Sequence, residues 1–233
     1  MTVVSELKET LVTACRILDE QGIMDELGHL SARVPNENLV IMNGRISPGQ
    51  ATAEDMVVLD LSGNKLEGRL EPAKEIPLHL SVYQKRSDVM AVAHTHSPMI
   101  VALSMAGITL RPADNLGATV FGGDVPLYEE CGLVDTFDMG YRITEAMGGS
   151  AVVMLKGHGN IVTGNSIEEC CISALWAEKA ARLQFQATLL GQPQYYSTEE
   201  IQKTRKQVTD GKAFRRAWNY YRWKLEQRQG ART

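Results

Sequence analysis

Two histidines stand two residues apart at the end of an apolar run, in the stretch VMAVAHTHSP (residues 89–98). On a strand, residues two apart point to the same face, so His94 and His96 are expected to lie side by side. Two imidazoles at this spacing can bind one metal ion, although a strand pair of this kind also occurs without one. A metal site therefore requires donors from elsewhere in the chain.

Two further residues could supply those donors. His158 stands between two glycines in VVMLKGHGNIV, where the backbone can turn sharply and leave the imidazole unobstructed; the alternative is an ordinary surface turn. Glu75 begins a predicted helix that carries His79 and Tyr83 on the following turns. Its carboxylate either stabilises the helix N-terminus or reaches the histidines as a metal ligand or general base. Three histidines and a glutamate suit zinc or a similar divalent ion.

Alternating helices and strands must position these residues. Pro77 is compatible with a helix only in the first turn, so that helix should begin near Lys74 or Glu75. The predicted helices cover residues 5–22, 74–86, 98–107 and 166–191, and the predicted strands cover 28–35, 38–42, 55–63, 89–96 and both arms of a turn within 150–164. The pattern indicates one α/β domain over residues 1–233, with 200–233 as a C-terminal helical tail.

Composition narrows the function classes. The net charge of −4 provides no general basic surface, which argues against nucleic-acid binding. The tail is locally basic and aromatic, but we interpret it as a helix that buries Phe214, Trp218, Tyr221 and Trp223. No stretch approaches the roughly 20 apolar residues of a membrane span, and the N-terminus lacks the apolar core of a signal peptide. With four cysteines and no CxxC pair, we expect a cytoplasmic protein that does not bind membranes.

The string KEIPLHLSVYQKRSDVMAVAHTHSP, followed further on by LKGHGNIVTG, resembles the class II aldolase/adducin family over most of residues 5–200. Glu75 precedes His94 by 19 positions (94 − 75 = 19), which is similar to the family's own spacing. The resemblance implies that His94, His96 and His158 are metal ligands. It also implies that Glu75 is an acid/base carboxylate that binds the metal when substrate is absent. One divalent ion per chain is expected, zinc first, with manganese, iron or cobalt as alternatives.

The same resemblance implies a three-layer α/β/α fold with a mainly antiparallel central sheet. It further implies a homotetramer with active sites between subunits, each completed by a residue from the neighbour. A C-terminal tyrosine often has this role in the family. Tyr220 or Tyr221 in WNYYRW is the candidate here, and we take Tyr221 as the catalytic choice.

Departures from the family pattern bear on the substrate. The sugar-phosphate members hold phosphate with a Gly-Asn turn and a pair of serines before the glutamate. Here His29 replaces the amide, and Pro-Ala-Lys at 72–74 replaces the serines. The chain is more similar to members acting on carboxylated aromatic acids, among them dihydroxyphthalate decarboxylases. We therefore expect a small carboxylate substrate, with His29 as a substrate contact or proton donor and Arg111 and Lys156 as carboxylate partners.

The chemistry shared by such sites is stabilisation of an enolate by a Lewis-acidic metal. We predict a metal-dependent carbon–carbon lyase that decarboxylates a non-phosphorylated hydroxylated aromatic acid, with Glu75 or His29 protonating the carbon. The first alternative is an aldolase or epimerase acting on a sugar phosphate or hydroxy-keto acid. The second is a non-catalytic, adducin-like interaction module, which would have no need of all four metal-binding side chains.

Overall fold

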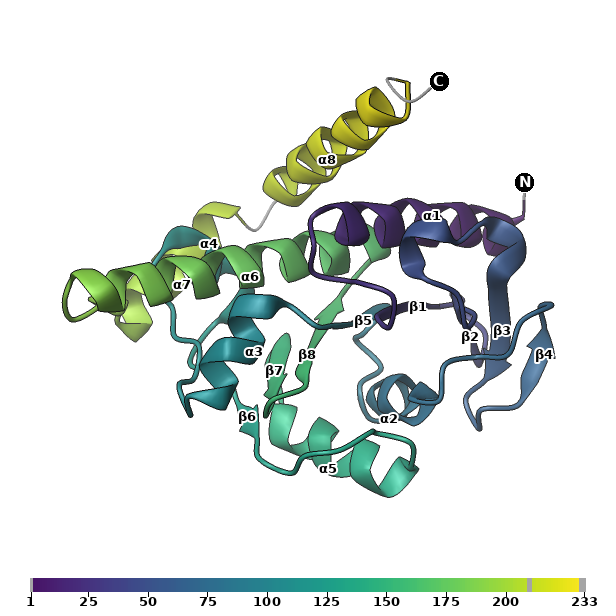
Figure 1. Ribbon diagram of the computed structural model, residues 1–233, viewed down its shortest axis with the longest axis horizontal. Coiled ribbons are helices and arrows are strands. Elements are labelled where there is room, and N and C mark those ends of the chain that lie inside the picture. The colour runs from purple at the N-terminus through teal and green to yellow at the C-terminus, as the bar shows by residue number, and fades with distance from the viewer. Residues whose placement is uncertain (1, 209–210, 231–233) are drawn as a thin grey trace.

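The computed structural model describes residues 2–208 and 211–230 (Figure 1). Its helices are α1 (Val3–Glu20), α2 (Ile76–Lys85), α3 (Pro98–Met105), α4 (Asn115–Phe121), α5 (Phe137–Met147), α6 (Ile167–Leu190), α7 (Thr198–Val208) and α8 (Lys212–Gly230). Its strands are β1 (His29–Arg33), β2 (Leu39–Asn43), β3 (Met56–Asp60), β4 (Lys65–Glu67), β5 (Ala91–Thr95), β6 (Leu127–Tyr128), β7 (Val152–Leu155) and β8 (Gly159–Gly164).

Within the described residues the strands form one eight-stranded sheet in the order β4-β3-β2-β1-β5-β8-β7-β6. Every neighbouring pair is antiparallel except β6 and β7. Helices α1 and α6 cover one face of this sheet, and α2 and α5 cover the other (Figure 1). The predicted three-layer α/β/α fold with a mainly antiparallel sheet is confirmed.

Helix boundaries follow local sequence signals. Pro77 lies in the first turn of α2, as predicted, and Ser166 caps α6 by accepting a hydrogen bond from the backbone N–H of Glu169. The start predicted for the first helix was wrong by two residues. Its N-cap is Thr2, whose hydroxyl accepts from the N–H of Ser5, so Ser5 lies inside the helix.

Strand register brings the candidate site residues together at one end of the central strands. In the antiparallel pair β1–β5, His29 lies directly opposite His94. On the other side of β5, strand β8 pairs Thr95 with Asn160. Because β8 begins directly after the turn that carries His158, that turn lies next to the end of β5.

The described residues of the predicted C-terminal tail belong to α7 and α8, and residues 209–210 and 231–233 of that tail lie outside the described residues. Helix α8 packs against α6 and α1. Trp218 and Tyr221 are buried and Phe214 packs against the core, but Trp223 is 55% exposed, so the prediction that it would be buried was wrong. In the part of the chain that the structure describes, no helix has the length and apolar character to span a membrane.

Candidate metal centre

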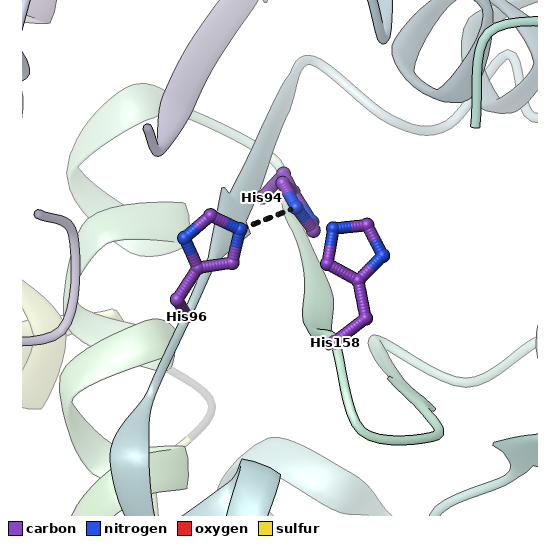
Figure 2. Close-up of side chains that lie close together, drawn as sticks. All are labelled: His94, His96 and His158. Carbon is purple, nitrogen blue, oxygen red and sulfur yellow. Dashed lines mark hydrogen bonds between the residues drawn. The ribbon is translucent and has the colours of Figure 1, made fainter. Parts of the chain in front are cut away.

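Three imidazoles converge where β5 ends (Figure 2). His94 is the fourth residue of β5 and is fully buried, while His96 follows the strand by one residue. Their Nε2 atoms are 3.1 Å apart. The ring of His158 lies 4.8 Å from that of His94 and 5.5 Å from that of His96, centroid to centroid. The predicted juxtaposition of these three residues is therefore present.

Glycines allow His158 to approach β5. Gly157 has φ +65°, a left-handed conformation that glycine adopts at low cost. A Cβ atom at Gly159 would lie 2.4 Å from the carbonyl oxygen of Thr95, so a side chain there would push the turn away from His94 and His96.

Glu75 faces the same cluster from the start of α2. It occupies the N-cap position, yet its side chain makes no capping hydrogen bond. Instead, Oε1 accepts a hydrogen bond from the N–H of Val134 at 2.9 Å and lies 3.7 Å from His158 Nε2. Oε2 lies 3.4 Å from His29 Nε2 and 3.7 Å from His94 Nε2. The carboxylate thus points into the site.

The protonation states suit a cation. Burial, followed by the neighbouring imidazoles, sets the pKa of His94 well below its usual range, and burial likewise lowers the pKa of His158 despite the opposing charge of Glu75. Burial alone would raise the pKa of Glu75, but hydrogen bonds from His29 and Val134 outweigh it and lower the pKa. These shifts favour neutral imidazoles at His94 and His158 beside an anionic Glu75.

This donor set fits a divalent ion. Metal ligation requires neutral histidine and ionised carboxylate, the states found here. One nitrogen from each of His94, His96 and His158 lies within 4.8 Å of the others, and the group His29, Glu75 and His94 meets the same criterion. The predicted ligands are thus gathered, but the geometry also brings in His29, which the family resemblance does not assign as a ligand.

Two contacts on the outer side of the cluster orient the rings of His96 and His158. The sequence predicted neither contact. His96 Nδ1 lies 3.2 Å from the Oδ1 atom of Asp25. His158 is hydrogen-bonded to the backbone of Gly132, two residues before Val134. Carboxylate and carbonyl partners of this kind hold a metal-binding imidazole in one tautomer and orientation.

A cavity of about 950 Å³ opens above the cluster. Its lining includes His29, Glu75, His96 and His158 together with the chain segments 26–29, 43–47, 73–75, 131–133 and 156–158. Both places that depart from the phosphate-binding pattern, His29 and the segment 72–74, contribute residues to this lining. The lining also carries a cationic wall, Arg45 and Lys74, which sequence reasoning did not single out as binding residues, although Lys74 belongs to the marked segment 72–74.

The remaining predicted site residues are distributed unevenly. Lys156 lines the cavity, but its Nζ atom forms an ion pair with Glu129 at 2.9 Å. Arg111 lies elsewhere: its guanidinium contacts Asp124 and stacks 4.0 Å from the ring centre of Tyr195. Tyr221 is buried in α8, with its hydroxyl 2.7 Å from Lys179 Nζ. The structure of the single chain therefore brings Lys156, but neither Arg111 nor Tyr221, to the cavity, and their roles stay predictions.

A mainly antiparallel α/β/α domain with a His₃Glu cluster at a strand end is the architecture of the class II aldolases. The family model for the class II aldolase and adducin N-terminal domain matches residues 9–185. This chain belongs to the class II aldolase and adducin family.

Individual relatives have two different reactions in their names. Over 197 residues the chain is 34% identical to a 3,4-dihydroxyphthalate decarboxylase from Arthrobacter keyseri, covering 79% of each chain. Over 155 residues it is 32% identical to a 5-deoxy-D-ribulose 1-phosphate aldolase from Bacillus thuringiensis serovar kurstaki, covering 66% of this chain and 71% of the relative.

A solved structure of an L-fuculose 1-phosphate aldolase has a TM-score of 0.81 and 24% identity, covering 88% of this chain and 96% of that chain, which supports the fold. The relatives together support a lyase of the class II aldolase type.

Proposed function

We propose that the protein is a divalent-metal-dependent decarboxylase of a hydroxylated aromatic carboxylic acid. The main support is the combination of the His₃Glu cluster with a cationic wall, Arg45 and Lys74, in the same cavity. The 34% identity to a dihydroxyphthalate decarboxylase agrees with it. Zinc is the first candidate for the ion, since imidazole and carboxylate are among its usual ligands.

The cationic wall favours a carboxylate as the group it binds. Arg45 is exposed and lines the cavity, and its guanidinium can donate two parallel hydrogen bonds to a carboxylate. Lys74 lies directly before Glu75, at the place of the family's serine pair. A substrate with one carboxylate on this wall would place its hydroxyl groups towards the histidines.

A divalent ion bound by His94, His96 and His158 would supply a Lewis acid for the negative charge that develops on the substrate. Glu75 is anionic at rest, so it can take the proton of a substrate hydroxyl as the substrate binds. Glu75, with His29 as the other group close enough to donate, returns that proton to the ring carbon that bears the carboxylate. The carbon–carbon bond then breaks, CO₂ leaves, and its electron pair restores the aromatic ring and its phenolate oxygen.

Product analysis tests the reaction. Protein reconstituted with zinc or manganese is incubated with 3,4-dihydroxyphthalate and, separately, with fuculose 1-phosphate, and released CO₂ and aldehyde are measured. We expect CO₂ from the first substrate. Aldehyde release from the phosphate alone would replace the proposal with the aldolase, the reaction in the name of the Bacillus relative. No activity on any substrate together with no metal uptake would favour the interaction module.

A pair of arginine variants tests the wall. Arg45→Gln should lower kcat/KM by roughly 10-fold, mainly through KM, because the arginine is exposed and its carboxylate contact is partly screened. Arg111→Gln is the matched control, since it removes the same charge from a residue that pairs with Asp124 outside the cavity lining. The reverse result would restore Arg111 as the carboxylate partner.

We further propose a cytoplasmic homotetramer with active sites between subunits. Leu27 and Leu133 line the cavity and are 65% and 48% exposed, as expected of apolar side chains that a neighbour covers. Of the two candidate tyrosines, Tyr221 is 6% exposed and Tyr220 is 52% exposed. Light scattering tests the assembly, and comparison of Tyr220→Phe with Tyr221→Phe shows which hydroxyl contributes to kcat.

A further inference from the structure

A chain of four buried side chains runs from the cavity into the core behind Glu75. His29 Nδ1 lies 2.7 Å from His79 Nε2, and His79 Nδ1 lies 2.7 Å from the hydroxyl of Ser31. That hydroxyl lies 2.9 Å from the hydroxyl of Tyr83. All four side chains belong to residues at most 3% exposed. Apart from His29, the reaction proposed above uses none of them.

The residue spacings of a strand and of a helix bring these four side chains together. His29 and Ser31 are two residues apart on β1 and therefore share one face of the sheet. His79 and Tyr83 are four residues apart on α2 and share the helix face that packs against it. Each residue of one pair thus meets a residue of the other, and α2 also carries Glu75 at its start.

The hydrogen bonds can run in one consistent direction. The Glu75 carboxylate is an anion and a hydrogen-bond acceptor. His29 Nε2, 3.4 Å away, therefore interacts favourably with this carboxylate only when Nε2 carries a proton. A neutral imidazole has one proton, which leaves His29 Nδ1 as an acceptor from His79 Nε2–H. His79 Nδ1 is then also an acceptor and takes the proton of Ser31.

The hydrogen bonds of Ser31 and Tyr83 follow the same donor-to-acceptor direction. The Ser31 hydroxyl lies closer to His79 than to the carbonyl oxygen of Val92, which is 3.4 Å away, so its proton is directed to His79. Its oxygen can then accept from the hydroxyl of Tyr83. Each link has one donor and one acceptor. The opposite direction would turn an imidazole lone pair towards the Glu75 carboxylate.

The four hydrogen-bonded side chains fix the orientation of His29 and do not supply protons. Burial raises the pKa of Tyr83 far above its ordinary value, and burial lowers the pKa of His79 well below its own. Neither group therefore changes its charge near neutral pH. A proton leaving Tyr83 would leave a buried phenolate, and the cost of burying that charge outweighs the stabilisation from Ser31 and Arg33.

We propose that His79, supported by Ser31 and Tyr83, is a positioning residue that holds His29 with its Nε2–H directed at Glu75. A protonated nitrogen cannot bind a metal, so His29 is excluded from the ligand set although it lies beside His94 and Glu75. The ion is left to His94, His96 and His158, with Glu75 as the further ligand when substrate is absent. The inference is independent of the substrate and holds for a decarboxylase or an aldolase.

Nitrogen-15 solid-state NMR of zinc-loaded, histidine-labelled protein tests the tautomer directly. The chain has five histidines, and the His29 signals are assigned by their loss in His29→Asn. We expect His29 to show a protonated Nε2 and an unprotonated Nδ1, with zinc-coordinated nitrogens on three other histidines. A proton on Nδ1, or zinc on His29, overturns the proposal.

Zinc affinity gives a second readout. His29→Asn removes only a contact behind a ligand and should weaken zinc binding by no more than about 10-fold, whereas His158→Asn should weaken it by more than about 100-fold. Equal losses in the two variants would mean that His29 is a ligand and would refute the inference.

Variants of the chain test the positioning role. In His79→Leu, His29 loses the partner of Nδ1, so its single set of signals should broaden or double. In His79→Gln the amide nitrogen can still donate to that atom, and one set should remain. Ser31→Ala should disturb the signals of His79, whereas Ser81→Ala should not, because the buried Ser81 hydroxyl has no hydrogen-bond partner among the described residues.

If His79→Leu does not fold, the comparison of Ser31→Ala with Ser81→Ala carries the test. Unchanged histidine signals in Ser31→Ala would refute a positioning role for the four hydrogen-bonded side chains. None of these measurements uses turnover, so they can fail while the CO₂ assay succeeds, and the reverse.

Discussion

The contact between Asp25 and His96 leads to a quantitative prediction about metal affinity. The Asp25 carboxylate lies 3.2 Å from His96 Nδ1, where it can accept the Nδ1 proton and leave Nε2 directed at His94 and the candidate metal site. Outer-shell carboxylates of this kind typically account for 10- to 100-fold in metal affinity. The Asp25 side chain is 54% exposed and therefore partly screened, which favours the lower end.

We expect Asp25→Ala to weaken zinc binding by about 10-fold, equivalent to about 1.4 kcal/mol. Asp25→Asn keeps an acceptor oxygen but loses the charge, so its loss should be smaller. Competition with a chromophoric chelator at pH 7.5 measures both. Glu26→Gln is the matched control, because Glu26 is the next residue and lines the cavity, so the variant removes an equal charge close to the histidines.

Two results would refute this reasoning. If Asp25→Ala binds zinc as tightly as wild type, the contact does not orient the ligand. If Glu26→Gln loses as much as Asp25→Ala, the effect is general attraction of a cation by nearby negative charge. The second possibility has its own signature, since raising the salt concentration should abolish a through-space effect more fully than a hydrogen bond.

Two further predictions concern stability. The folded-state pKa values of His79 and His94 lie below the ordinary value, so the unfolded chain takes up protons first as the pH falls below about 6.5. The free energy of unfolding should therefore fall by up to about 1.4 kcal/mol per pH unit for each group. Urea unfolding of chelator-treated protein at pH 7.5 and 5.5 should show the difference, and equal midpoints would contradict it. Gly140→Ala places a Cβ 2.4 Å from the Ser81 hydroxyl between α2 and α5 and should cost about 1–3 kcal/mol in the same assay, whereas Gly149→Ala, which meets open space, should change little.

The clustering of His94, His96 and His158 could be predicted from sequence because its signal is local. A His-x-His pair on a strand places both rings on one face whatever surrounds the strand. A histidine between two glycines indicates a turn that can approach another element. The position of Glu75 at the start of α2 followed from Pro77 alone. The family resemblance then joined three separate segments that local patterns could not have joined.

The contacts behind the ligands depend on sheet order and register, and the sequence did not predict them. Asp25 meets His96 because β1, which follows Asp25, pairs with β5. The four-residue chain behind Glu75 has two local signals, His-x-Ser at 29–31 and the four-residue spacing of His79 and Tyr83. Neither signal says that α2 lies over β1. Strands β4 and β6 and helix α4 were also not predicted, since each is short. Helix α5 was missed although its buried residues Met139, Ile143 and Met147 recur at helical spacing.

The electrostatics of the cluster favour a metal ion over protons as the balancing charge. In many histidine sites a metal must displace protons, so its affinity falls steeply as the pH is lowered. Here burial and mutual repulsion already keep His94 and His158 neutral, and hydrogen bonds keep Glu75 ionised, before any ion binds. The buried Glu75 anion beside the neutral His94 and His158 therefore attracts a cation without prior deprotonation of these two histidines. Zinc affinity should accordingly be almost independent of pH between about 6.5 and 8, the range above the ordinary histidine pKa.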